Sequence, residues 1–379
     1  TLKRMIRYMK VFEENNIRYS VVSLDAKIEI AAINKTSIFK KTQSFTIFRF
    51  LVRNTLFFAF LSIYYKEVRH SISVFRKWRS NQYPKPDIVV FHDPFTFWIC
   101  RKYTQKLKAK IILFHHGGNP EDNMLFDYYP ILKKRSWVNR RINQFNLKCL
   151  SLPDAMVFIN PESYHNFCIK YKLLKKKFNL IVNGIEDVYT ENNNRNNKNK
   201  NKYNLVTVGT INDRKNQILL LKALSIASPQ LKYEIKITIV GDGPLLKKLI
   251  DYSSYNNLDQ FVEFVGNQKE ITSFLSNADI FILASKKEGL PISLLEALSF
   301  NLPIISSNIS GSRECVIEGK NGILFKSNDE RALSKIFCSL DNYNWGAFGE
   351  TSRKLFESKF QFNQMQESYI DLLNELYTH

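Results

Sequence analysis

The chain has 379 residues, of which 44% are hydrophobic, and its formal net charge at pH 7 is +20. This length suits two domains rather than one, and the hydrophobic share is enough for real cores. The charge predicts an anionic partner: nucleic acid, an acidic membrane face or a phosphorylated substrate. Nucleic acid ranks third of these, because zinc-finger spacing and RNP-type motifs are absent from the sequence.

The cysteines and the hydropathy pattern indicate the compartment. The five cysteines are scattered, odd in number and without a CxxC pair, which is typical of reduced thiols in a cytosolic protein. No signal peptide is recognisable, and no apolar run reaches the ~20 residues that span a bilayer. We therefore expect a cytoplasmic protein.

The first elements in chain order are an amphipathic helix over residues 1–15 and a strand over residues 17–24. The most apolar and aromatic run follows at residues 45–65. It contains Phe57 and Phe58, together with Arg49 and Arg53, which stand one helical turn apart. A membrane-surface helix has this composition, with inserted aromatic side chains and arginines on lipid phosphates. A buried helix of the first domain, followed by a solvated basic helix, explains the pattern equally well.

Two apolar runs, residues 87–91 and 110–114, are expected strands that end in turns. Loops at the carboxyl ends of parallel strands form the ligand crevice of doubly wound sheets. His116 stands in such a loop just before a glycine pair, so it is a candidate functional histidine. His115 is the alternative, one residue away and facing the opposite direction.

The middle of the chain continues this alternation of strands and turns. A strand is expected at residues 153–160, and an Asn-Gly-Ile turn follows at residues 183–185. Residues 191–202 are almost entirely Asn and Lys, which predicts a linker without a role in a core. Further strands are expected at residues 205–208, 235–240 and 261–265, ending respectively at Gly209, at Gly241, and at Gly266 with Asn267.

The stretch from residue 279 to residue 307 predicts a strand, a polar loop, a helix and a second strand. Residues 280–284 form an apolar run, and Pro291 stands where a helix can begin because its missing N–H is not needed in the first turn. Pro303 prevents the helix from continuing beyond about Phe300. This order is the repeating unit of a parallel sheet, so we expect an α/β fold.

The loop and first turn of this helix carry the chemistry. Free N–H groups at the helix start, together with the helix dipole, form a place for an anion such as a diphosphate. Glu288 lies just before the helix and Glu296 about two turns inside it, so their carboxylates can flank one elongated ligand. Each carboxylate accepts two hydrogen bonds, which suits the paired hydroxyls of a ribose or a hexose. A loop acid and a solvated helix acid would be the alternative for two glutamates alone.

Glu288-x7-Glu296, with Gly289, Leu290 and Pro291 between, resembles the E-x7-E motif of retaining GT-B glycosyltransferases of glycosyltransferase family 4, the glycosyl transferases group 1. The resemblance extends over nearly the whole chain. It implies that Glu288 contacts the donor sugar, that Glu296 binds the ribose, and that the backbone from Gly289 to Ile292 holds the diphosphate.

The remaining motifs fall in the order of that family. By this resemblance Lys215 neutralises the donor diphosphate, and His116 meets the donor hexose and the acceptor. The resemblance also places Gly117 and Asn119 on the acceptor side, Gly209 and Gly241 near the phosphates, and Gly266 and Asn267 at the nucleotide base.

Two departures from the family pattern stand out. The arginine expected just after Gly209 is replaced by Thr210, although Arg214 can bridge phosphate oxygens in its place. The family's first strand and glycine-rich loop have no counterpart before the first helix, so the first strand of the N-terminal domain is apparently missing.

The resemblance implies a GT-B fold, in which two Rossmann-like doubly wound domains face each other across a cleft. We expect an N-terminal acceptor-side domain at residues 1–185, a linker at 186–202 and a nucleotide-sugar donor domain at 203–355. Residues 356–379 are expected to form a helix that crosses back to the first domain. No D-x-D triplet occurs in the sequence, so neither a metal nor another cofactor is expected.

The function implied is a metal-independent, retaining transfer of a hexose from a UDP- or GDP-sugar. The expected acceptor is a lipid-linked or polymeric glycan of the envelope at an anionic membrane surface, with the protein peripheral on the cytoplasmic face. A non-catalytic GT-B subunit that supports a partner glycosyltransferase is the alternative, and Thr210 favours it. A phosphorylase or synthase of storage glucan is a second alternative, which the basic aromatic run disfavours.

Overall fold

The computed structural model describes residues 56–63, 68–80, 85–117, 129–189, 202–227, 229, 231 and 234–378. The helix and strand expected over residues 1–24 and most of the expected linker lie outside these residues. The chain forms two compact units, one comprising Thr1–Phe114 with Asn123–Met156 and the other His115–Asp122 with Val157–His379. The domain boundaries expected at residues 185 and 202 stay a prediction.

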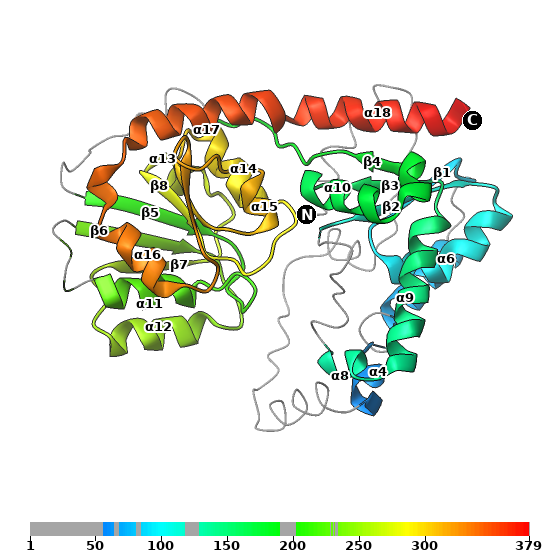
Figure 1. Cartoon of the computed structure of the whole chain (residues 1–379), viewed down its shortest axis with the longest axis horizontal. Coiled ribbons are helices and arrows are strands. Elements are labelled where there is room, and N and C mark those ends of the chain that lie inside the picture. Colours follow the sequence, from blue (N-terminus) through cyan, green and yellow to red (C-terminus); the bar gives the residue numbers. More distant parts are fainter. Residues whose placement is uncertain are drawn as a thin grey trace. The chain divides into compact units, whose positions relative to one another are not determined.

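A four-stranded sheet with the order β1-β2-β3-β4 occupies the first half of the described chain (Figure 1). Its strands are β1 (Ile88–Phe91), β2 (Lys110–His115), β3 (Ala155–Phe158) and β4 (Phe178–Leu180). β1 and β2 run parallel, with Ile88 opposite Lys110. The helices of this part are α4 (Leu56–Ile63), α5 (Arg69–Ser80), α6 (Pro94–Lys106), α8 (Pro130–Lys133), α9 (Ser136–Ser151), α10 (Pro161–Lys170) and the 3-10 helix η2 (Lys172–Lys177).

Side-chain caps start the two helices that follow β1 and β3. The Asp93 carboxylate accepts from the Thr96 N–H at 2.7 Å, and the Asn160 side chain accepts from the Ser163 N–H at 2.8 Å. Each cap is followed by a proline at the first helical position, where no N–H is needed. α10 therefore begins at Pro161.

The second sheet has six strands in the order β10-β9-β8-β5-β6-β7, and every pairing in it is parallel. Its strands are β5 (Lys202–Val208), β6 (Glu234–Val240), β7 (Val262–Gly266), β8 (Ile280–Leu283), β9 (Ile304–Ser307) and β10 (Gly322–Phe325). Read from β7, this is the doubly wound order 3-2-1-4-5-6. The predicted α/β class with parallel sheets is confirmed.

Helices cover both faces of this sheet (Figure 1). On one face α11 (Ile218–Ala227), α12 (Leu246–Tyr255) and α16 (Glu330–Phe337) pack into a core with Leu220, Leu224 and Phe337 fully buried. On the other face α13 (Thr272–Ser276), α14 (Ile292–Ser299) and α17 (Trp345–Lys359) enclose a second core around Phe281 and Phe356. Because both faces are covered, the central strand β8 is a continuous apolar run, Ile-Phe-Ile-Leu, with all four residues buried.

The C-terminal part consists of η4 (Leu340–Asn342), α17 and α18 (Phe362–Thr378), while the short α15 (Ser310–Arg313) precedes β10. The turn at residues 183–185 pairs with the junction between α17 and α18, where the Ile185 N–H donates to the Phe360 carbonyl at 2.9 Å. A Cβ on Gly184 would lie 2.4 Å from the Gln361 carbonyl oxygen, so only glycine allows this approach.

Arg353 on α17 also binds the chain just after this turn, at Asp187. Its Nη1 donates to Asp187 Oδ1 at 2.9 Å and to the Ser299 carbonyl at 2.9 Å, and its Nη2 pairs with Asp187 Oδ2. Burial raises the pKa of Asp187, but hydrogen bonds from Arg353 and the Tyr189 N–H outweigh this and hold the pKa below its usual 3.8.

The aromatic run before residue 65 is represented by α4. Ala59 of α4 is fully buried with Tyr129, Leu132 and Val138, so one face of α4 packs on α8 and α9. Phe60 keeps 42% of its surface exposed. Arg49 and Arg53 lie outside the described residues, as do the side chains of Phe57 and Phe58, so the membrane-contact interpretation of these four residues stays a prediction. None of the helices in the described ranges is long and apolar enough to cross a bilayer.

Candidate functional site

The candidate site lies where the strand order of the second sheet reverses. From β5 the chain moves outward through β6 and β7 on one side, and then returns to build β8, β9 and β10 on the other. The loops that leave β5 and β8 therefore lie outside the carboxyl ends of these strands, at the position where doubly wound sheets bind their ligands. Both loops were singled out by their sequence motifs.

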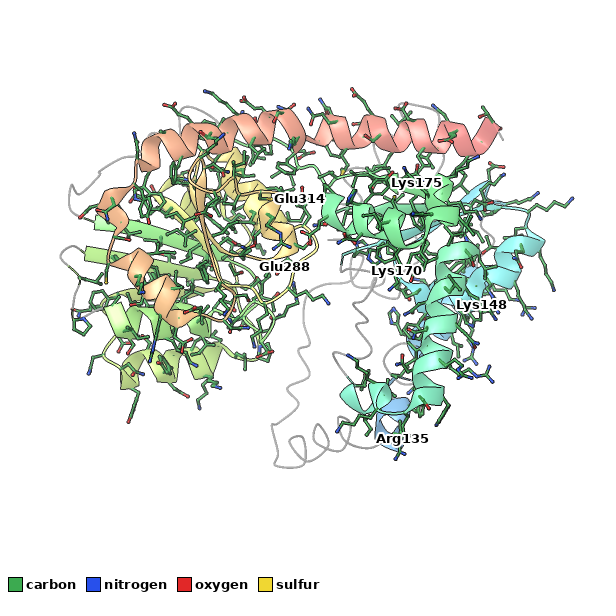
Figure 2. All side chains as sticks on the ribbon, viewed as in Figure 1. Arg135, Lys148, Lys170, Lys175, Glu288 and Glu314 are labelled. Atoms are coloured by element: carbon green, nitrogen blue, oxygen red, sulfur yellow. The ribbon has the colours of Figure 1, made fainter. Side chains whose placement is uncertain are left out.

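Glu288 joins the two loops. Its Oε1 lies 2.9 Å from Lys215 Nζ and accepts from the Ser285 hydroxyl at 3.0 Å, while its Oε2 pairs with Arg214 Nη1. The Glu288 side chain is only 9% exposed and the Lys215 side chain 12%. We call these four residues, Arg214, Lys215, Ser285 and Glu288, the Glu288 group, and Figure 2 labels Glu288. The group brings three residues predicted from the sequence into direct contact.

The loop after β5 holds Lys215 in place. The Lys215 N–H donates to Asn212 Oδ1 at 2.9 Å, and Arg214 binds the opposite loop through Nη1 to the Lys287 carbonyl at 3.2 Å. A Cβ on Gly209 would approach the Lys215 side chain to 3.3 Å, and Gly209 has a φ of +151°. The lysine stem thus lies over the strand end, with its charge directed at the other loop.

The start of α14 lies beside the Glu288 group. β8 is buried throughout, and Pro291 precedes the first helical residue, Ile292, so the backbone from Gly289 to Ile292 turns out of the strand into the helix. α14 ends at Ser299, before Phe300, as expected from Pro303. N–H groups of this first turn have no partner within the helix, and the helix dipole favours an anion there.

Gly289 is a point of close backbone packing. A Cβ at Gly289 would lie 2.1 Å from the His116 carbonyl oxygen, and one at Gly117, where φ is +121°, would lie 2.5 Å from the Gly289 Cα. A Cβ at Gly311 would lie 2.6 Å from the Gly289 carbonyl oxygen. The turn predicted after β2 therefore packs directly on the loop that carries Glu288.

Asn160 is a site residue that the sequence did not reveal. Its side chain is 1% exposed, and its Nδ2 donates to the Gly289 carbonyl at 2.6 Å. Its Oδ1 caps α10 and also accepts from the Ser310 hydroxyl at 3.2 Å. The only signal in the sequence is an Asn-Pro pair after a strand, which indicates a helix cap but gives no hint of the contact with Gly289.

The two histidines after β2 have different surroundings. The His115 ring packs on Phe158 and Phe167, with centroid distances of 5.1 and 4.7 Å. His116 reaches solvent, yet the protein atoms packed around it lower the pKa of its imidazole below the usual 6.5 through desolvation, so it is neutral at pH 7. Asn119 lies outside the described residues.

The other predicted site residues differ in their contacts and exposure. Gly241 packs on Gly209, because a Cβ there would lie 2.1 Å from the Gly209 carbonyl oxygen, and its N–H donates to the Gly266 carbonyl at 2.8 Å. Thr210 and Asn267 are exposed, whereas Glu296 on α14 is half-buried. In the described part of the chain, no cluster of three His, Cys, Asp or Glu side chains is placed to hold a metal ion.

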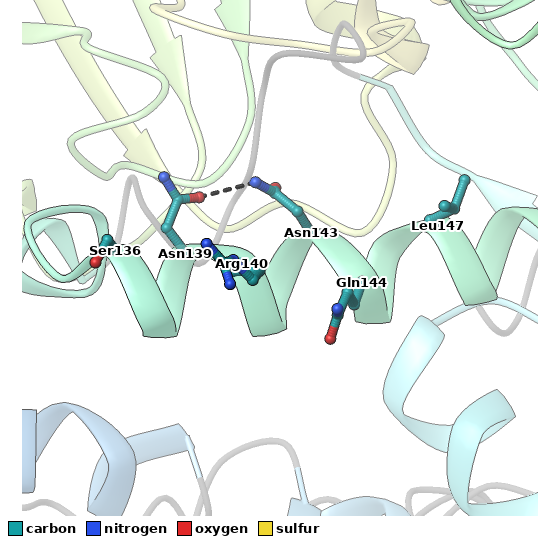
Figure 3. Close-up of a pocket in the computed structure, with 6 residues that line it drawn as sticks. All are labelled: Ser136, Asn139, Arg140, Asn143, Gln144 and Leu147. Carbon is teal, nitrogen blue, oxygen red and sulfur yellow. Dashed lines mark hydrogen bonds between the residues drawn. The ribbon is translucent and has the colours of Figure 1, made fainter.

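A separate hollow lies along α9 (Figure 3). It measures about 450 Å³ and is lined by Ser136, Asn139, Arg140, Asn143, Gln144 and Leu147. All six residues belong to one helix, so the hollow lacks the opposing walls that enclose a ligand. The Glu288 group has convergent charges and a helix start, and is the better candidate on chemical grounds.

Known proteins resemble this chain in sequence. Residues 188–344 match the family model described as glycosyl transferases group 1, and this segment contains the whole Glu288 group. A Campylobacter jejuni α-1,4-N-acetyl-D-galactosaminyltransferase, named for a glycan on PP-undecaprenol, is 29% identical over 178 residues. The match covers 46% of this chain and 49% of that protein. The chain spans 33% to 52% of the length of the first curated relatives that it matches.

Solved structures resemble the fold. Anabaena HepE in complex with UDP has a TM-score of 0.64 at 15% identity, over 81% of this chain and 82% of that one. A glycosyltransferase from Rickettsia africae has a TM-score of 0.61 at 16% identity, over 99% and 94% of the two chains. The chain thus has the GT-B fold. The family match in its second sheet and this fold together support a GT-B glycosyltransferase.

Proposed function

We propose that the chain transfers a hexose from a UDP- or GDP-sugar to a lipid-linked or polymeric glycan, with retention of the anomeric configuration. The observation that carries this proposal is the Glu288 group, in which one nearly buried carboxylate is held between two cations where the strand order of the second sheet reverses. UDP in the related Anabaena structure supports a nucleotide-linked donor.

The cations of the group suit a diphosphate. Lys215 has three N–H donors and Arg214 has five, so both can bind phosphate oxygens while one donor of each remains on Glu288. The first-turn amides of α14 add further donors from the other loop. Glu288, placed between these donors, is positioned to accept hydroxyls of the donor hexose and orient its reactive carbon.

The reaction follows from these roles. The bond between the sugar C1 and the diphosphate oxygen breaks, and the acceptor oxygen bonds to C1 on the same face. The acceptor proton passes to the departing phosphate oxygen. Lys215 and Arg214 stabilise the negative charge that develops on the diphosphate. Glu296 binds the ribose, and neutral His116 contacts the hexose on the acceptor side.

The acceptor and the location form the less direct part of the proposal. The Campylobacter relative is named for a glycan on PP-undecaprenol, and this chain carries a net charge of +20. Both support an acceptor at an anionic membrane. We propose that the protein acts there in envelope polysaccharide synthesis, on the cytoplasmic face. We assign contact with that surface to Arg49, Arg53, Phe57 and Phe58.

The test is turnover of a panel of sugar nucleotides by the full chain, with and without lipid-linked acceptor. Glu288→Ala is measured beside Glu367→Ala, which removes an exposed carboxylate on α18. We expect one sugar nucleotide to be hydrolysed or transferred, with activity lost in Glu288→Ala and kept in Glu367→Ala. If every sugar nucleotide is inert, the non-catalytic GT-B subunit takes the place of the enzyme.

A further inference from the structure

A second concentration of charge lies on a short surface segment at residues 170–177, which we call the lysine segment. It runs from the last residue of α10 through η2, and has the sequence Lys-Tyr-Lys-Leu-Leu-Lys-Lys-Lys. Five of its eight residues are lysines and none is acidic. Figure 2 labels Lys170 and Lys175, whose side chains are both exposed.

The 3-10 conformation of η2 determines which side chains of the lysine segment are exposed. Residues three apart superpose along a 3-10 helix, so η2 has three rows of two residues each. Two of these rows are exposed, Lys172 with Lys175 and Leu173 with Lys176, whereas Leu174 and Lys177 are half-buried. The outer surface of η2 therefore consists of three lysines and one leucine.

Leu173 is the most exposed large hydrophobic side chain in the described chain, at 99%. Ile169, at the end of α10, is 56% exposed. A single exposed leucine needs no explanation in a soluble protein, and a lysine run is usually just solvated. The combination is more informative, because an apolar tip surrounded by lysines is the pattern of a segment that lies in a membrane interface.

The fold fixes the lysine segment in this orientation. Tyr171 packs on Phe167 with ring centroids 5.7 Å apart, and Phe178, which is 5% exposed, packs on Phe158 at 5.1 Å. The segment is therefore anchored at both ends in an aromatic cluster below it. Because the residues on both sides of η2 are packed in the core, the outward orientation of Leu173 is fixed before binding. Docking would therefore not cost the conformational entropy of ordering a loop.

We propose that the lysine segment docks on an anionic lipid bilayer, with Leu173 inserted at the level of the acyl chains and the exposed lysines on lipid phosphates. The inference deepens the membrane part of the proposed function, and it names residues that the sequence did not single out. Nucleic acids and other polyanions suit the segment less well, because they provide no apolar phase into which Leu173 could insert. Proteins that bind single-stranded nucleic acid also use aromatic side chains for base stacking, and the exposed residues of η2 are lysines and a leucine.

The expected strength follows from charge and salt. Each lysine near an anionic leaflet strengthens partitioning about fivefold, and the attraction fades over a Debye length of about 8 Å at physiological salt. Removing three lysines should therefore weaken binding to anionic vesicles by about 100-fold at low salt. Replacing Leu173 by a polar residue should cost a further factor of roughly three or more at any salt concentration.

The experiment is sedimentation of the full chain with vesicles rich in phosphatidylglycerol and with vesicles of phosphatidylcholine alone. The variants are K172Q/K175Q/K176Q and Leu173→Ser. The matched controls are K222Q/K247Q/K248Q, which removes the same charge from exposed positions on α11 and α12, and Ile250→Ser, which removes a side chain that is 41% exposed. All substituted side chains are exposed, so all variants should fold, and thermal melting checks this.

We expect the wild type and both controls to bind the phosphatidylglycerol vesicles, and both variants of the lysine segment to lose binding as stated. Equal loss in the lysine variant and its control would show that net charge alone is responsible, and would overturn the proposal. Binding to heparin or RNA without binding to phosphatidylglycerol vesicles would overturn it as well. Vesicle binding needs no turnover, so this result and that of the sugar-nucleotide panel are independent.

Discussion

Asn160→Asp is the substitution that probes the candidate site most selectively. Asp is nearly isosteric with Asn, and its carboxylate can still accept from the Ser163 N–H, so α10 keeps its cap. The change replaces the Nδ2 donor by an oxygen, which would face the Gly289 carbonyl oxygen across 2.6 Å. One contact is thus turned from attraction to repulsion while the others remain.

The consequence for the donor site follows from the planarity of the peptide bond. The Gly289 carbonyl and the Leu290 N–H belong to one peptide plane and point in opposite directions. Asn160, by holding the carbonyl, fixes the direction of an N–H that we assign to the diphosphate. Asn160 is 1% exposed, and the loss of a hydrogen bond at such a buried group costs about 1–3 kcal/mol. If the peptide plane rotates and this cost falls on donor binding, the affinity for the donor becomes about 5- to 150-fold weaker.

The assay is calorimetric titration of UDP and GDP into the full chain, with thermal melting in parallel. We expect Asn160→Asp to weaken nucleotide binding by at least about fivefold. Ser310→Ala, which removes only the contact with Asn160 Oδ1, should leave the binding near that of the wild type. A folded Asn160→Asp that binds nucleotide as tightly as the wild type would refute the role given to Asn160.

Two further predictions concern backbone space and the C-terminal region. Gly289→Ala should introduce about 1–3 kcal/mol of strain, because its Cβ would lie 2.1 Å from the His116 carbonyl oxygen, and should thereby weaken UDP or GDP binding at least about fivefold. Gly346→Ala, whose Cβ would meet only the Asn344 side chain at 3.5 Å, should bind and melt normally. Arg353→Met should lower the free energy of unfolding by about 1–2 kcal/mol at pH 7 in denaturant titrations. Because the folded-state pKa of Asp187 lies below 3.8, the part of this stabilisation that comes from Asp187 is complete above that pH and disappears as the pH falls through the folded pKa, whereas the hydrogen bond to the Ser299 carbonyl remains. An equal effect at pH 7 and at strongly acidic pH would contradict this prediction.

Much of the architecture could be predicted from the sequence, because buried parallel strands are short apolar runs bounded by glycine, proline and polar turns. Residues 280–284 and Pro303 gave β8 and the end of α14 nearly to the residue. The strand order that places β5 beside β8 could not be derived from such local patterns, because it depends on how separate strands pack. It was expected only through the family resemblance.

The candidate site shows the same division. Glu288 was found because it stands in a loop with a recognisable local pattern, and Lys215 was found through the family resemblance. Their contact at 2.9 Å agrees with a shared role. Thr210 replaces the arginine of the family pattern, so it was open which residue besides Lys215 supplies positive charge to the diphosphate. In the structure Arg214 pairs with the Glu288 carboxylate, as Lys215 does. Asn160 was missed because its contact with Gly289 joins positions 129 residues apart, and local patterns contain no information on such a pair.

The central claim is that the Glu288 group binds a nucleoside diphosphate, and titration of UDP and GDP into Lys215→Met tests it most directly. Lys247→Met, on the exposed side of α12, is the control for lost charge. We expect one nucleotide to bind the wild type and the control alike, and to bind Lys215→Met about 10- to 100-fold more weakly, as for the loss of one charged hydrogen-bond partner. Equal affinity of Lys215→Met and the wild type would show that the diphosphate is held elsewhere, and the account of this site would be wrong.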